Sequence, residues 1–171
     1  MTEFALVAPV LLLLTFGIID FGRALYFYAA AGNAAREAAH AAALASTPLP
    51  SDSDVTAAAA VHFPGASFST PAPACINGPI PGGTPAAGTA WLFITDPSPA
   101  IAGEPPTPAN GPGGEVPPGP GGACSVVVPA VGNQVLEVTI VYNFAPVTPL
   151  VSTVIGNHIV FTLQVLARTE Y

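Results

Sequence analysis

Near its N-terminus the chain carries 16 consecutive residues without a charged side chain, from Phe4 to Ile19. As one α-helix this run is about 24 Å long, a little short of the roughly 30 Å hydrocarbon core of a bilayer. Apolar residues resume after Asp20 and Arg23, so we expect the helix to use Leu25 to Tyr28 as well. The sequence therefore predicts a membrane-spanning helix with Asp20 and Arg23 near its far boundary, where an i,i+3 pair of opposite charges neutralises itself.

The apolar run continues without a polar break into an alanine-rich stretch that ends at Ser46, Thr47 and Pro48. We predict one long helix over about residues 2–46, loosened in its first turns by Pro9. Two interpretations of the alanine-rich half stay open, namely close packing with other helices through small residues and ordinary packing on its own domain. A cleaved secretory signal is the alternative for the apolar run, but Glu3 stands where a signal carries basic residues, so we expect retention.

Most of the 17 glycines and 21 prolines lie in residues 48–123, which predicts a long irregular Pro/Gly-rich loop. Two pieces of it are expected to be ordered: a short helix over Val55–His62, opened by Ser53 or Asp54, and a strand over Thr89–Thr95. The organisation is then a helix at 1–47 and a β-rich domain at 48–171, whose strands occupy 124–171.

The two cysteines, Cys75 and Cys124, lie in this Pro/Gly-rich setting and in no C-x-x-C motif. We predict a disulfide between them if the domain lies outside the cytoplasm. The alternative is a pair of unlinked small apolar residues.

The C-terminal region alternates apolar and polar residues as half-buried strands do. The alternation covers VLEVTIVYNF at 135–144 and HIVFTLQVLARTE at 158–170, and SVVVP at 125–129 is a further short strand. The two long strands should pair antiparallel and leave one apolar face, which the second half of the N-terminal helix is available to cover. The predicted fold class is α+β, with a long transmembrane and spine helix packed on a small antiparallel sheet.

Composition excludes several classes of function. Only 8% of the residues are charged, the net charge is −7, and the only bases are Arg23, Arg36 and Arg168. Nucleic-acid binding requires clustered cations, as does a polybasic contact with lipid, so membrane attachment must be hydrophobic. The histidines are isolated and no nucleophile or phosphate-binding motif is present, so we expect no metal, no cofactor and no enzymatic activity.

Two blocks of sequence resemble the TadE-like family of tight-adherence pilus proteins, within the type IV pilin class. The first is TEFALVAPVLLLLTFGIIDFGRALYFYAAAGNAAREAAH, and the second comprises VTIVYNFAPVTPL and LQVLARTE. The matching features of the first block are Glu3 and Phe4, Pro9 within the apolar run, and the break formed by Asp20, Gly22 and Arg23.

The resemblance implies a pilin-like minor pilin or pseudopilin that is inserted in the cell membrane by one helix, with its C-terminal domain outside the cytoplasm. It also implies its partners, which are membrane lipid, pilin-like subunits or copies of itself, and the pilus assembly machinery. Glu3 would be the acidic residue that follows the prepilin-peptidase site. Its carboxylate would pair with the N-terminal amine of a neighbouring subunit, because a lone carboxylate in hydrocarbon is costly.

Two functions therefore remain open. The first is a structural pilus component that assembles through its N-terminal helix. The second is a monomeric, membrane-anchored adhesion or binding module that presents the loop between Cys75 and Cys124 to a partner.

Overall fold

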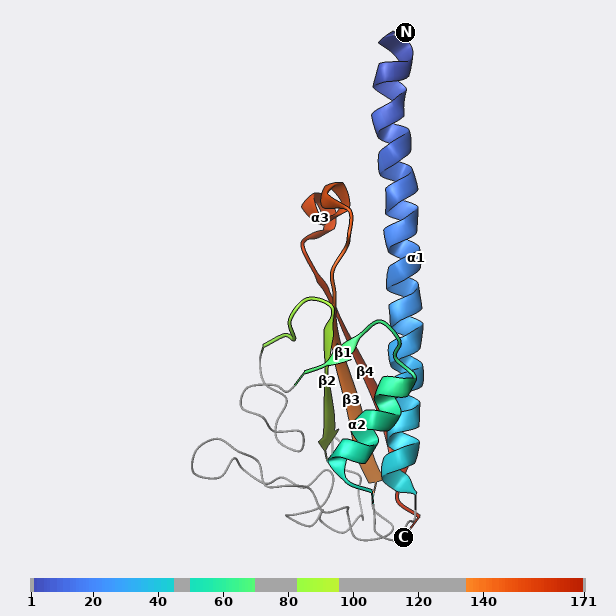
Figure 1. The fold of residues 1–171 in the computed structure, drawn as a ribbon, viewed down its shortest axis with the longest axis vertical. Coiled ribbons are helices and arrows are strands. Elements are labelled where there is room, and N and C mark those ends of the chain that lie inside the picture. The colour runs from blue at the N-terminus through green and yellow to red at the C-terminus, as the bar shows by residue number, and fades with distance from the viewer. Residues whose placement is uncertain (1, 45–49, 70–82, 96–134, 171) are drawn as a thin grey trace.

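The structure is a computed structural model, which describes residues 2–44, 50–69, 83–95 and 135–170. A single long helix, α1 (Thr2–Ala43), stands beside a small domain of four strands and two short helices (Figure 1). The fold is α+β, as predicted. The predicted strand at 125–129 and the predicted disulfide between Cys75 and Cys124 lie outside the described residues.

Helix α1 has 42 residues and runs through Pro9 as one element. Its length is about 63 Å at 1.5 Å per residue, far more than the small sheet domain needs as a cover. The N-terminal half of α1 therefore extends well beyond the strands (Figure 1). The predicted single helix is confirmed, with its end at Ala43 instead of about residue 46.

The sheet has the order β1-β2-β3-β4, with β1 at Ser67–Phe68, β2 at Thr89–Thr95, β3 at Val135–Phe144 and β4 at Ile159–Arg168. Strand β3 pairs antiparallel with β2 and with β4, in the latter case along its whole length from Val135 opposite Arg168 to Phe144 opposite Ile159. The two-residue strand β1 pairs parallel with β2. The predicted antiparallel pairing of the two long C-terminal strands is confirmed. The sheet as a whole is mixed, because the short edge strand β1, which the sequence did not predict, runs parallel to β2.

The core lies between the sheet and the second half of α1. One face of the sheet carries the apolar residues of β3 from Leu136 to Phe144 in alternate positions, together with those paired to them on β2 and β4. Against it pack the alanines of α1, each at most 8% exposed, at positions 30, 31, 34, 35, 38, 39 and 42. The spacing of three and four residues places them on one side of the helix. Of the two interpretations of the alanine-rich half, the structure shows packing on its own domain.

Helix α2 (Asp52–Val61) closes the core beside α1 through Val55, Ala59 and the following Phe63, all 2% exposed or less. It begins three residues before the predicted start because Ser51, not Ser53 or Asp54, is its N-cap. Ser51 and Asp54 form a capping box, in which the Ser51 backbone N–H donates to the Asp54 carboxylate at 2.9 Å and the Asp54 N–H donates to the Ser51 hydroxyl at 3.3 Å.

The connection between β3 and β4 contains a third helix, α3 (Pro149–Ile155), where the sequence predicts only a Pro-bearing link. Pro149 occupies the first helical position, where its missing N–H costs nothing. In Figure 1, α3 lies beyond the ends of the strands and alongside α1. Of the described elements of the sheet domain, it is nearest to the N-terminus of α1.

Candidate functional site: the free half of α1 and its junction at Asp20

In the charge-free run of α1, residues 4–19, most of the side chains that the structure describes are exposed; we call this run the free half. Phe4 is 75% exposed and Ile18 is 63% exposed. The other large apolar side chains with 40% or more of their surface exposed are Val7, Val10, Leu11, Leu12, Leu13, Leu14, Phe16 and Ile19. Exposed apolar surface of this extent marks a membrane or protein contact.

The free half is suited to a surrounding without water. The hydroxyl of Thr15 donates to the Leu11 carbonyl at 2.8 Å, so this polar group is satisfied within the helix itself. One candidate membrane span, Val7–Ala43, is found among the described residues by length and apolar composition. A Cβ atom placed on Gly17 or Gly22 would meet nothing within 4 Å, so the fold of the protomer does not require glycine there.

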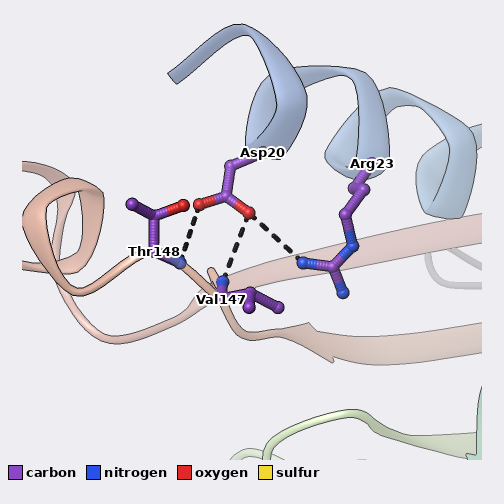
Figure 2. Close-up of polar contacts among 4 residues, drawn as sticks. All are labelled: Asp20, Arg23, Val147 and Thr148. Carbon is purple, nitrogen blue, oxygen red and sulfur yellow. Dashed lines mark hydrogen bonds and ion pairs between the residues drawn. The ribbon is translucent and has the colours of Figure 1, made fainter. Parts of the chain in front are cut away.

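The free half ends at Asp20, which joins α1 to the connection between β3 and α3 (Figure 2). Its carboxylate accepts hydrogen bonds from the backbone N–H groups of Val147 at 3.2 Å and Thr148 at 3.1 Å, more than 120 residues away in the chain. Arg23 donates to the same carboxylate at 3.2 Å, which is the predicted i,i+3 pair. Asp20 is 3% exposed, so these three donors replace the water that the carboxylate loses.

Arg23 links the junction to an aromatic cluster on the sheet. Its guanidinium carbon lies 5.9 Å from the ring centroid of Phe27 and 5.5 Å from that of Phe144, within the range of a cation–π interaction. Phe27 stacks in turn on Tyr142, with ring centroids 5.2 Å apart. Arg23 thereby contacts α1 and β3 at once.

A second tie holds the other end of α1, where the Glu170 backbone N–H donates to the Ala43 carbonyl at 2.9 Å. The two ties, at Asp20 and at Ala43, bracket the alanine-rich segment that packs on the sheet; we call residues 20–43 the packed half. The helix is therefore divided at Asp20, with the domain attached on one side and unattached on the other.

The predicted assembly residues fall into three groups. The side chain of Glu3 lies outside what the structure describes, whereas Phe4, Pro9 and Gly22 are exposed on α1 and lie apart from one another. Asp20 and Arg23 are the pair that the structure brings together.

Sequence reasoning missed Val147 and Thr148, the partners of Asp20. A local signal was present, because both residues lie between Pro146 and Pro149, where their N–H groups need an acceptor that no strand ladder supplies. The sequence does not show which acceptor it is.

Among the described residues, no group of three His, Cys, Asp or Glu side chains could hold a metal ion. The arrangement is an apolar helix segment that projects from a small domain, with the buried Asp20 carboxylate at the point where the helix leaves the domain. It can enter a membrane or a bundle of helices while the domain stays in water.

The family model of TadE-like proteins matches residues 1–40. Neither a curated protein nor a solved structure matches the chain. The matched segment covers the free half, the Asp20 junction and most of the packed half of α1. The predicted resemblance is therefore confirmed over residues 1–40, which are similar to TadE-like proteins.

Proposed function

We propose that this chain is a structural minor pilin or pseudopilin of a tight-adherence-type pilus, which is anchored in the membrane and assembles through the free half of α1. The observation that carries the proposal is the division of α1 at Asp20. The free half exposes large apolar side chains from Phe4 to Ile19, whereas the packed half buries its alanines in the domain. The TadE-like match over residues 1–40 supports it.

In this proposal the chain spans the membrane once and its sheet domain lies outside the cytoplasm. Membrane lipid surrounds the free half before assembly, and pilin-like subunits or copies of the same chain replace the lipid afterwards. Gly17 and Gly22 support the second step, because small residues let helix backbones approach closely and the protomer itself leaves the space beside them open. The role is structural and involves no catalysis.

Glu3 would act in assembly by pairing its carboxylate with the N-terminal amine of a neighbouring subunit. A carboxylate inside hydrocarbon is costly without such a partner, so the pair would favour the register in which the two groups meet.

Photo-cross-linking in native membranes tests the proposal. A photoreactive residue at Leu13, in the free half, should form covalent adducts between copies or with another pilin-like subunit, and Glu3→Ala should reduce these adducts. Glu37→Ala is the matched control, because it removes an acidic side chain from the packed half of the same helix. A probe at Leu13 that reacts only with lipid, in a protein that stays monomeric, would contradict assembly and favour the adhesion-module alternative.

A further inference from the structure

The segment from Ala145 to Asn157, which we call the α3 tip, contains no charged residue. It comprises α3 and the turns on either side of it, at the end of the β3–β4 hairpin. Figure 1 shows it alongside α1 on the side toward the N-terminus, away from the rest of the sheet. The tip therefore points in the direction in which the free half extends.

The Asp20 junction fixes the level of the tip along α1. Asp20 binds the backbone of Val147 and Thr148 directly (Figure 2). Ile19, the residue before it, is the last of the charge-free run. Any surface that receives the free half up to Ile19 therefore meets the α3 tip at the same depth. This placement belongs to the single protomer and needs no neighbouring subunit.

The tip presents apolar surface at this level. The side chain of Val147 is 70% exposed, even though its backbone N–H is held by Asp20. On α1, Ile18 and Phe21 at the same level are 63% and 65% exposed. The exposed apolar residues of the tip and those at the end of the free half thus lie at the same height along α1.

The backbone of the tip is also prepared for a surrounding that is poor in water. Donors without a partner are costly there. The N–H groups of the tip that donate to protein acceptors include those of Val147, Thr148, Val151, Ser152 and Gly156, and Pro146 and Pro149 carry no N–H group. The Ser152 hydroxyl donates to the Pro149 carbonyl at 2.8 Å.

We propose that the α3 tip is a second membrane contact, which rests in the headgroup and acyl-chain boundary of the bilayer that α1 crosses. The proposal rests on the proposed membrane anchoring of α1. The occupant is lipid, because the tip reaches the level of the membrane boundary in each anchored protomer and carries no charge to hold it in water. Two contacts, at α1 and at the tip, would set the tilt of the sheet domain over the membrane.

Depth-dependent fluorescence quenching of the full chain in vesicles tests the contact. Trp91 is the only tryptophan, so Trp91→Phe provides a background into which Val147→Trp, Leu12→Trp or Leu44→Trp is introduced. The vesicles contain phosphatidylcholine and phosphatidylglycerol, with bromine atoms placed either near the headgroup or deep in the acyl chains. Asn157→Trp, at the other end of the tip, replaces Val147→Trp if that variant does not fold.

We expect the tip tryptophan to be quenched about twofold or more by shallow bromines, the depth at which interfacial segments lie. Leu12→Trp should be quenched by deep bromines, and Leu44→Trp, at the far end of α1, by neither. Quenching at position 12 without quenching at the tip would overturn the lipid contact and leave the anchoring intact. If the fluorescence of the tip tryptophan changes with the number of protein copies per vesicle and not with bromine, the lipid contact would be overturned in favour of contact with a second copy. Absence of quenching at position 12 would overturn both proposals.

Discussion

The two halves of α1 differ in what surrounds them, although they belong to one helix. In the free half, large side chains such as Leu12 and Phe16 face outward on all sides. In the packed half, alanines such as Ala34 and Ala38 are fully buried, because their small size brings the helix close to the sheet. The two halves therefore differ in side-chain size: small side chains pack on the sheet domain, and large apolar side chains are left exposed for contact with lipid or another protein.

The largest expected effect comes from a charge in the packed face. Ala38→Asp places a carboxylate where the native side chain is 0% exposed. We expect the free energy of unfolding to fall by about 3–5 kcal/mol, the cost of a buried and unpaired charge. Urea titration in non-ionic detergent, followed by Trp91 fluorescence, measures it.

Ala29→Asp is the matched control for this variant. It makes the same substitution at an exposed position of the same helix, so propensity effects cancel. If Ala29→Asp lowered the free energy of unfolding as much as Ala38→Asp, the helix would have no face that packs preferentially on the sheet. The contrast between the two halves of α1 would then be contradicted.

The junction between the halves should show the next largest effect. Asp20→Ala leaves the N–H groups of Val147 and Thr148 without their acceptor, and an unsatisfied buried donor costs about 1–3 kcal/mol. These two amides should exchange with deuterium about tenfold faster or more, since about 1.4 kcal/mol corresponds to a factor of ten.

Arg23→Ala separates the ion pair from the backbone contacts. It removes the partly exposed partner of Asp20 together with its contacts to the Phe27 and Phe144 rings, but it leaves the Asp20 carboxylate on the backbone. We therefore expect the Val147 and Thr148 amides to keep most of their protection. Equal loss of protection in the two variants would mean that the ion pair, and not the carboxylate contact with the backbone, holds the connection.

Two glycines sharpen the comparison further. A Cβ on Gly32 would lie 3.4 Å from the Leu163 side chain, whereas a Cβ on Gly22 would meet nothing. Gly32→Leu should therefore lower the free energy of unfolding by about 1–3 kcal/mol through overpacking. Gly22→Leu should leave the protomer stable and instead reduce the cross-links between copies. The reverse pattern, measured by the same urea titration and photo-cross-linking, would contradict the proposed roles.

The smallest effect concerns the cap of α2, which lies beside the packed half. Ser51→Ala should cost about 1 kcal/mol, a typical value for a lost N-cap. The hydrogen bond from the Ser51 side chain lowers the pKa of Asp54 below its usual value of 3.8. A lowered pKa in the folded state stabilises the protein above the unfolded-state pKa, and this contribution is lost as the pH falls through the folded value.

The difference in stability between the wild type and Ser51→Ala should accordingly shrink as the pH drops below about 4. Urea titrations of both proteins over the acidic range measure it. A difference that grows on acidification would show that Asp54 does not take part in the cap as an anion.

Much of this fold could be predicted from local patterns. The long apolar run and the alanine-rich stretch after it predict α1. Alternation predicts β3 and β4, and the segment TAWLFIT predicts β2, in each case with bounds close to those observed. The pair of Asp20 and Arg23 follows from their spacing on a helix. Each of these features is written in neighbouring residues.

The features that were missed depend on distant contacts. Strand β1 has two residues, too few for a pattern, and exists because it pairs with β2. Both faces of β3 are buried, so Thr139 and Asn143, which its alternation assigns to an open face, are 0% and 5% exposed. The contact of Asp20 with Val147 joins residues 127 positions apart, and no local pattern contains it.

The most direct test of the division of α1 is the accessibility of single cysteines in native membranes, in a Cys75→Ser, Cys124→Ser background. Leu12→Cys lies in the free half and His40→Cys lies at an exposed position of the packed half. A membrane-impermeant maleimide added from the side of the sheet domain should label residue 40 and leave residue 12 unlabelled. Labelling of residue 12 as fast as residue 40 would mean that the free half lies in water, and would contradict the account.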